Sequence, residues 1–380
     1  MNIQTDFVRS LPGDQKELSI KKNYLRLWSI DGPLLILILS ISLVGLFVLF
    51  SASGRNIDLL FKQAVNFTVA FLAMLVVAQF KVKTIKALTP YSFILGLILL
   101  TFVIFFGVDV KGAQRWIDVF GLFRFQPSEL MKIVVPLSVA WYLSDKLLPP
   151  NTKNIFISFF IVLVPAFFIF LQPDLGTSIL IAASGFFVIW LGGIGWRFLI
   201  TIFGFLILSS WPIWIFLLKS YQKQRILTLF NPEGDKLGAG WNIIQSKTAI
   251  GSGGWDGKGW LSGTQSHLDF LPESHTDFVI AVLAEEFGFI GVFLLLLTYF
   301  LIIIRATVIA VSANTTYARL VAGSITLTFF IYVIVNMGMV SGMLPVVGIP
   351  LPFISYGGTA IVTMMVNFGI LMSISTDDSA

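Results

Sequence analysis

Acidic and basic residues that could do chemistry gather in a few short segments of the chain. One segment places Asp277 close to Glu273 and His275. A carboxylate can act as a general base, and polar neighbours can orient it or change its pKa. Small residues follow Asp277 at near-helical spacing, which predicts that Asp277 lies in the first turn of a helix at the rim of a bundle. The alternative is a carboxylate that only complements the helix dipole.

A second segment carries a carboxylate and an ammonium group three residues apart. Pro127 favours a helix start, and this helix would place Glu129 and Lys132 on one face. The spacing predicts an ion pair. The pair is either structural or presents Lys132 to a phosphate from the wall of a water-filled cavity.

Two further polar groups precede apolar stretches. Lys111 and Arg115 stand beside Trp116, a combination that suits a diphosphate and an aromatic anchor at a membrane surface. Asp174 follows a proline and opens an apolar stretch. It is expected to cap a helix, to bind a divalent cation such as Mg²⁺ or Mn²⁺, or to do both, with capping favoured.

Composition excludes several classes of site and of protein. There are no cysteines and only two histidines, so thiolate chemistry and histidine metal centres are excluded. The glycine-rich run from Ile250 to Trp260 lacks the Walker spacing, so no nucleotide or organic cofactor is expected. The chain is 56% apolar and 12% charged, which is incompatible with a water-soluble globule.

Long apolar stretches separated by short polar breaks predict an all-α polytopic membrane protein with about ten transmembrane helices. A long extracytoplasmic loop, 219–276, would join helices 7 and 8. Glu285 and Glu286 would then lie two turns into the eighth span, where ionisable groups are functional candidates. The predicted spans are 31–50, 59–79, 87–106, 127–145, 154–171, 175–193, 197–218, 277–304, 317–341 and 350–374.

Basic residues set the predicted orientation, because positively charged loops stay in the cytoplasm. We expect a cytoplasmic segment 1–30, one membrane domain 31–374 and a cytoplasmic tail 375–380. The supporting residues are Arg9, Lys16, Lys21, Lys22, Arg26, Lys81, Lys83, Lys86, Lys146, Lys153, Arg197, Arg305 and Arg319.

Four segments then lie outside and should meet at one surface: 107–126, 172–174, 219–276 and 342–349. Several lysines and arginines occur in them against the usual bias. Either an external anionic partner or anionic lipid headgroups would explain this excess. Prolines and the run from Ser355 to Gly358 predict a broken approach to the last span, and such backbone is tolerated where it is buried in protein or lines a cavity.

Together these motifs resemble the SEDS family (shape, elongation, division and sporulation), over residues 30–374. The run after Val340 favours the elongation branch, RodA, over the division branch, FtsW. The motifs that carry the resemblance are KGAQRW (111–116), RFQPSE (124–129), QPDLGT (172–177), GAG (238–240), QSK (245–247), FLPE (270–273), HTDF (275–278) and the stretch 336–359.

The resemblance implies a peptidoglycan glycosyltransferase that polymerises lipid II, an undecaprenyl-diphosphate disaccharide, in the bacterial inner membrane during cell elongation. It implies that Asp277 is the essential carboxylate, with the active site on the periplasmic face. The implied partners are a class B penicillin-binding protein and the elongation proteins MreC, MreD and RodZ, and no nucleic acid. The expected substrate-binding residues are Lys111, Arg115, Trp116, Glu129, Lys132, His275 and Ser355.

Two other functions fit a bundle of this kind. A lipid II flippase would also use many helices with buried charges, but no inverted repeat is evident and the polar residues gather at the outer rim. A noncatalytic scaffold would leave the external carboxylate and the basic loops without a role. The polymerase is therefore the preferred hypothesis.

Overall fold

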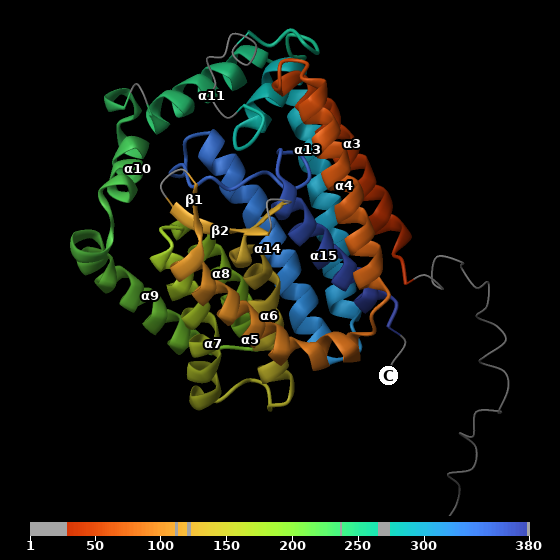
Figure 1. The fold of residues 1–380 in the computed structure, drawn as a ribbon, viewed down its shortest axis with the longest axis vertical. Helices are drawn as coiled ribbons and strands as arrows, with labels where there is room; N and C mark the ends of the chain where they lie inside the picture. The colour runs from red at the N-terminus through yellow and green to blue at the C-terminus, as the bar shows by residue number, and fades with distance from the viewer. Residues whose placement is uncertain (1–28, 111–112, 120–122, 236–237, 265–273, 378–380) are drawn as a thin grey trace, which may run out of the picture.

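The computed structural model describes residues 29–110, 113–119, 123–235, 238–264 and 274–377, and this part of the chain is almost entirely helical (Figure 1). The segment 1–28, most of the predicted cytoplasmic N-terminal segment, lies outside the described residues. Eight described helices are long and apolar enough to cross a membrane: α3 (Gly32–Ala52), α4 (Ile57–Ala78), α5 (Val82–Phe106), α7 (Thr152–Leu171), α9 (Trp196–Pro212) continued by the π-helix η2 (Ile213–Leu217), α13 (Val279–Ser312), α14 (Thr316–Val340) and α15 (Gly358–Ser375).

Two further helices complete the bundle. They are α6 (Pro127–Ser144), which carries a charged pair, and α8 (Leu175–Leu191), which has 17 residues. Each of the ten predicted spans thus corresponds to one helix in the described part of the chain, which confirms an all-α polytopic membrane protein. Almost every side chain of α6 is buried, because α5, α7, α8, α14 and α15 surround it.

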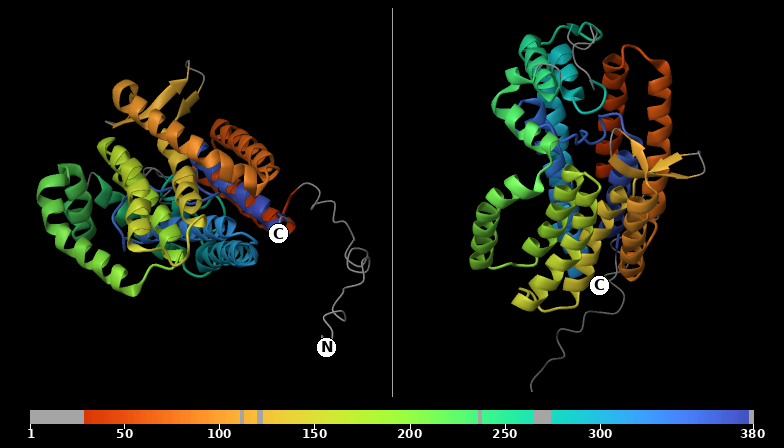
Figure 2. Two further views of the ribbon diagram at one scale, coloured as in Figure 1. Left: turned by 90° about the horizontal axis from the view of Figure 1, so that it is seen from below. Right: turned by 60° about the vertical axis from the view of Figure 1, so that its left-hand side comes forward.

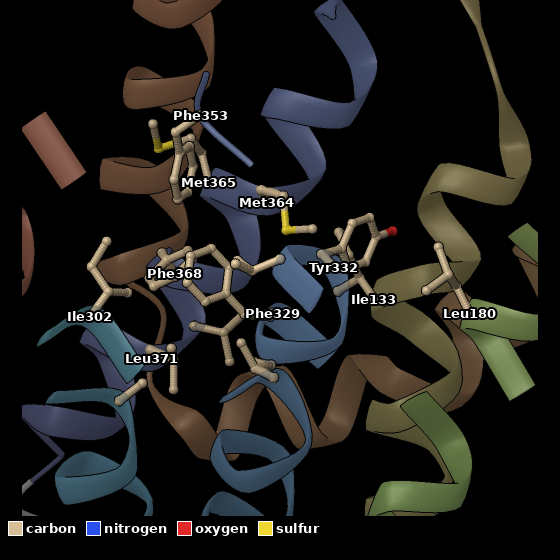
Figure 3. Packing of buried hydrophobic residues seen from close by; sticks show 14 of the residues in the cluster. Ile133, Leu180, Ile302, Phe329, Tyr332, Phe353, Met364, Met365, Phe368 and Leu371 are labelled. Carbon is tan, nitrogen blue, oxygen red and sulfur yellow. The ribbon is translucent and has the colours of Figure 1, made fainter. Parts of the chain in front are cut away.

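Aromatic packing joins the last two helices to the segment between them. The rings of Phe329 and Phe368 meet edge to face with centroids 5.1 Å apart, and Phe353 packs 5.4 Å from Phe368 (Figure 3). Such pairs add to the burial of large apolar surfaces. Phe353 belongs to the non-helical stretch before α15, which confirms the predicted broken approach to the last span.

The predicted outer segment 107–126 contains a small antiparallel sheet, which its polar composition does not predict. Its strands are β1 (Val108–Val110), β2 (Ala113–Val119) and β3 (Phe123–Phe125), in the order β1-β2-β3. Trp116 pairs with Val108, and Ile117 pairs with Phe125. The sheet lies beside the beginning of α6, at the end of the bundle that we call the outer end.

The long segment 219–276 is largely helical where it is described. It contains α10 (Ser220–Phe230), the short 3₁₀ helix η3 (Pro232–Gly234) and α11 (Ala239–Gly253). α11 packs along α13, and the Ser246 hydroxyl donates to the carbonyl oxygen of Val340 at the end of α14 at 2.8 Å. The segment therefore arches from α9 to the outer part of α13 (Figure 1).

α13 differs from the predicted continuous helix in two ways. It begins after Asp277, which lies in a turn of residues 274–278, and its regular backbone is interrupted at Gly288, where φ is +62°. Backbone groups of segment 254–259 form hydrogen bonds with the backbone of α13 on both sides of the interruption. Lys258 and Gly259 donate to the carbonyls of Glu285 and Glu286 at 3.0 and 2.9 Å, and the amides of Phe289 and Ile290 donate to the carbonyls of Gly254 and Trp255 at 2.9 and 3.2 Å.

α9 stands apart from the other helices (Figure 2). None of its residues is buried, and its ring contacts are made by Phe198, near its beginning, with Phe156 and Phe159 of α7. A helix that is apolar on all sides and is not covered by protein is exposed to lipid in a membrane. α9 therefore packs against the rest of the bundle over only a small area.

Candidate active site

A cavity of about 250 Å³ lies at the outer end of the bundle, where the sheet meets α6, α8, α14 and the approach to α15. Five residues proposed from sequence line it together: Arg115, Trp116, Glu129, Lys132 and Asp174. They come from three separate parts of the chain: β2, the beginning of α6 and the turn before α8. Lys111, also proposed from sequence, lies outside the described residues.

Three helices begin at this cavity. Residues at the starts of α6, α8 and α15 line it, and each of these helices has at least 17 residues. The first amides of a helix have no partner within the helix, and its N-terminus carries a partial positive charge. The Asp174 carboxylate already caps α8, and the starts of α6 and α15, together with Arg115 and Lys132, favour an anion in the cavity.

The predicted ion pair of α6 is confirmed. Lys132 Nζ lies 2.6 Å from Glu129 Oε1, and the two residues are 9% and 6% exposed. The ammonium group also lies 5.6 Å from the centre of the Tyr332 ring, which favours a cation. Glu129 Oε2 has no hydrogen-bond partner within the described part of the chain. The pair therefore leaves one carboxylate oxygen buried without a donor at the edge of the cavity.

Arg115 connects the sheet to the turn between α7 and α8. Its Nε and Nη2 donate to the carbonyl oxygens of Gln172 and Pro173 at 3.3 and 2.5 Å. The Tyr221 hydroxyl of α10 also donates to Pro173 at 3.0 Å, and Arg225 donates to Val347 at 3.4 Å. These contacts join all four predicted outer segments, which confirms that they meet at one surface.

The Asp174 carboxylate is already engaged by three groups. Oδ1 accepts from the Thr177 amide at 3.2 Å, as a helix cap does, and Oδ2 accepts from Gln126 Nε2 at 3.3 Å. Arg115 Nη1 lies 3.6 Å from the same Oδ2. A divalent cation here would have to displace the Gln126 donor and lie beside a guanidinium, and no group of three or more metal-ligating side chains occurs among the described residues. The geometry fits a cap and does not fit a cation at Asp174.

Asp277 borders the cavity wall. Its Oδ2 lies 3.4 Å from the position that a Cβ atom on Gly348 would occupy, and Gly348 lines the cavity with φ at +82°. A side chain at 348 would be strained by this positive φ, and its Cβ atom would be in van der Waals contact with the carboxylate. Gly348 therefore lies next to Asp277 in a conformation that favours glycine.

Two proposed substrate-binding residues lie away from the lining of this cavity. Ser355 is 2% exposed, and its Oγ accepts from the Leu351 amide at 2.8 Å beside a smaller cavity that shares Glu129 and Tyr332. The carbonyl of His275 accepts from the Tyr356 amide at 2.9 Å. The structure gives both residues contacts that shape the backbone near the site.

Two carboxylates proposed from sequence as functional candidates do not line the cavity. Glu285 and Glu286 contact neighbouring segments instead. Glu285 is fully buried and accepts from Lys258 Nζ at 2.7 Å and from the Thr264 amide at 2.8 Å. Glu286 accepts a hydrogen bond from the Ser51 hydroxyl of α3. These carboxylates fasten the outer loop and α3 to the first part of α13.

Two buried amides near the site were not singled out from sequence. Gln63 of α4 donates to the Ser355 carbonyl at 3.2 Å and accepts from the Gly357 amide at 3.4 Å. Asn336 of α14 donates to the carbonyls of Asp277 and Ile349 at 3.0 and 2.7 Å. The available signal was the presence of amide side chains within otherwise apolar spans.

Comparison with known proteins agrees with this architecture. A model of the cell cycle protein family of FtsW, RodA and SpoVE matches residues 32–380. The chain belongs to this family. It is 48% identical to peptidoglycan glycosyltransferase MrdB of Escherichia coli K12 over 94% of this chain and 96% of that one. It is 34% identical to the probable peptidoglycan glycosyltransferase FtsW of Trichlorobacter lovleyi, again over 94% and 96% of the two chains.

Solved structures give the same result. A chain from a peptidoglycan synthase complex, described as coordinating polymerization and crosslinking, is similar with a TM-score of 0.81 and 28% identity, over 92% of this chain and 98% of that one. The rod shape determining protein RodA of Thermus thermophilus is similar with a TM-score of 0.71 and 26% identity, over the same shares. These matches and the eight apolar helices make this a multi-pass membrane protein.

Proposed function

We propose that this chain is a peptidoglycan glycosyltransferase that polymerises lipid II into glycan strands during cell elongation. The observation that carries the proposal is the cavity at the outer end, which is lined by Arg115, Lys132 and the starts of three helices and whose wall residue Gly348 lies next to Asp277. An anion-binding space beside a carboxylate suits a sugar diphosphate and a proton acceptor. The 48% identity to a peptidoglycan glycosyltransferase supports the same activity.

In the proposed reaction, Asp277 accepts the proton of the sugar 4-hydroxyl of incoming lipid II. The hydroxyl oxygen then forms a bond to the anomeric carbon of the growing chain, and the bond from that carbon to the diphosphate breaks. The configuration inverts because attack and departure take place on opposite faces. Undecaprenyl diphosphate leaves with the electron pair of the broken bond.

The departing diphosphate needs positive charge nearby. Arg115 already uses Nε and Nη2 on backbone carbonyls, which fixes the guanidinium while part of it faces the cavity. Lys132 brings a second cation, whose charge Glu129 partly balances before substrate arrives. We propose Lys111 and Trp116 as further contacts of the lipid-linked sugar diphosphate, with His275 and Ser355 shaping the backbone around it.

A divalent cation, Mg²⁺ or Mn²⁺, remains a proposed cofactor. The Asp174 carboxylate already accepts from Gln126 and Thr177 and lies beside Arg115. We therefore expect that any such ion binds with the lipid diphosphate and not at a preformed protein site. When bound, it would neutralise diphosphate charge. No nucleotide or organic cofactor is proposed.

The proposed setting is the bacterial inner membrane, with both termini in the cytoplasm and the cavity facing the periplasm. α9, which has no buried residue, leaves the side of the bundle accessible to a polyprenyl chain. A class B penicillin-binding protein is the proposed partner, since a similar chain is found in a complex that couples polymerization to crosslinking. The elongation proteins MreC, MreD and RodZ are proposed as further partners.

The function is tested with purified protein in vesicles that contain labelled lipid II and the partner, whose transpeptidase is blocked by a β-lactam. Polymer length on a gel and the lipid II exposed on each leaflet are measured in the same sample. We expect glycan strands that depend on this chain. Movement of lipid II between leaflets without strands would replace the polymerase by the transporter.

A further inference from the structure

Asn336 joins two separate backbone segments beside the cavity. It lies near the outer end of α14 and is fully buried. Its Nδ2 donates to the carbonyl oxygens of Asp277 at 3.0 Å and of Ile349 at 2.7 Å. Both partners are acceptors, so the NH₂ group and not the amide oxygen must face them. One side chain therefore uses both of its protons on two segments that are far apart in sequence.

These two segments are the ones that place the Asp277 carboxylate next to the cavity wall. The first is the turn 274–278, which carries Asp277. The second is the wall segment 347–350, in which Gly348 approaches Asp277 Oδ2 and Ile349 lines the cavity. A shift between turn and wall would change the place of the carboxylate relative to anything bound in the cavity.

We propose that Asn336 is a positioning residue that sets Asp277 at the cavity wall, an inference that rests on the proposed catalytic role of Asp277. Catalysis by a general base requires hydrogen-bond reach to the proton it removes, and a misplacement of about 1 Å can cost roughly 10²-fold in rate. Because Asn336 donates to the backbone carbonyl of Asp277 itself, it fixes the backbone position from which the carboxylate extends.

Other contacts of the same turn act farther from Asp277. The Ser274 hydroxyl donates to the Ala52 carbonyl at 3.1 Å, and the carbonyl of His275 accepts from Tyr356. Both hold the first half of the turn. Asn336 adds the contact at the carboxylate-bearing residue and links it to the wall, a combination that neither of the other two contacts makes.

The amide also has a feature that argues against simple packing. Asn336 Oδ1 is buried and has no hydrogen-bond partner within the described part of the chain. A leucine of similar size would remove this unpaired oxygen but would leave the Asp277 and Ile349 carbonyls without their donor. The NH₂ group of the amide is thus matched by two carbonyl acceptors, whereas its oxygen is not matched by a donor.

The test compares Asn336→Leu and Asn336→Asp with Ser246→Ala and Asp277→Asn in the full chain with its partner. Asn336→Asp keeps the shape and, when protonated, one donor, so it provides a second variant if the leucine variant does not fold. Ser246→Ala removes a buried hydrogen bond of 2.8 Å to the Val340 carbonyl, which involves neither Asp277 nor Ile349. Turnover, KM for lipid II, thermal stability and hydrogen exchange of residues 274–279 are measured.

We expect both folded Asn336 variants to lose roughly 10- to 100-fold in kcat with KM for lipid II nearly unchanged. Hydrogen exchange should be faster in 274–279, whereas Ser246→Ala should keep its kcat. Unchanged kcat in a folded Asn336 variant, or a raised KM with normal kcat, would overturn the inference. Full activity of Asp277→Asn would instead overturn the proposed role of Asp277, so the two failures are distinguishable.

Discussion

At the cavity, a buried carboxylate and ammonium group three residues apart determine much of the local charge. Glu129 and Lys132 are 2.6 Å apart, and each side chain is about one-tenth exposed or less. Removal of one partner from such a pair leaves a buried charge uncompensated, which typically costs about 3 to 5 kcal/mol. The pair is therefore important for folding whatever its role in substrate binding.

We predict that Lys132→Met lowers the free energy of unfolding by about 3 kcal/mol, and that Glu129→Gln combined with Lys132→Met recovers most of it, because no charge then remains buried. Thermal unfolding in detergent measures this. Strand synthesis by the folded double variant then separates the role of Lys132 in folding from its role in substrate binding. We expect strand synthesis to stay low, because the double variant lacks the cation proposed to contact the diphosphate. Wild-type synthesis by that variant would remove Lys132 from substrate binding.

Two arginines of the small sheet provide a matched comparison. Arg115 lines the cavity, whereas Arg124 has a side chain that is 58% exposed and lies 4.0 Å from Asp118. We predict that Arg115→Ala lowers kcat/KM for lipid II at least roughly tenfold, because a hydrogen-bonded charge near the diphosphate is lost. Arg124→Ala should have little effect. Equal loss of activity, or loss of folded protein that accounts for the whole Arg115 effect, would contradict the assignment.

Among the elements, α13 depends on a loop that precedes it in sequence. The loop 254–259 pairs with its interrupted backbone, and a Cβ atom on Gly257, where φ is +79°, would overlap the Glu286 carbonyl. Gly259 also has a positive φ, +97°, but a Cβ atom there would meet nothing nearer than Ser262 Oγ at 3.7 Å. The two glycines thus share a backbone conformation and differ in packing.

We predict that Gly257→Ala destabilises the protein more than Gly259→Ala. Both variants carry the left-handed cost of about 1 to 2 kcal/mol, and only Gly257→Ala must also separate the loop from α13. Melting temperature and strand synthesis measure the difference. Equal melting temperatures would mean that this loop does not hold the first part of α13, and hence the turn with Asp277, in place.

The apolar spans could be predicted because each is about as long as a membrane is thick, and all ten predicted spans correspond to helices. The interruption at Gly288 could not be predicted, because it depends on hydrogen bonds from a loop more than twenty residues away. The strands around Trp116 and the helices α10 and α11 were likewise missed, since polar composition alone resembles an irregular loop. Tertiary contacts determine these features.

The candidate site was predicted in part for a similar reason. Arg115, Glu129 and Lys132 carry charge in or beside apolar spans, which marks them in a sequence. Asn336 and Gln63 are neutral, and their importance follows from backbone carbonyls and amides that only the fold brings to them. The same holds for Gly348, whose closeness to Asp277 joins segments about seventy residues apart.

Across the whole molecule, orientation in the membrane can be tested directly because the chain has no cysteine. Asp256 and Asp145 are both exposed and lie at opposite ends of the bundle by the predicted topology. We predict that Asp256→Cys reacts with a membrane-impermeant maleimide in intact spheroplasts, whereas Asp145→Cys reacts only after permeabilisation. The reverse pattern would place the cavity on the cytoplasmic side.

The bundle as a whole places Asp277 next to the wall of a cavity lined by Arg115 and Lys132, and we propose that this carboxylate is the base. The most direct measurement is strand synthesis from labelled lipid II by wild type, Asp277→Asn and the exposed control Asp256→Asn, at matched stability and with the partner present. We predict a loss of about 10²-fold or more for Asp277→Asn and none for Asp256→Asn. Wild-type synthesis by a folded Asp277→Asn would contradict the account.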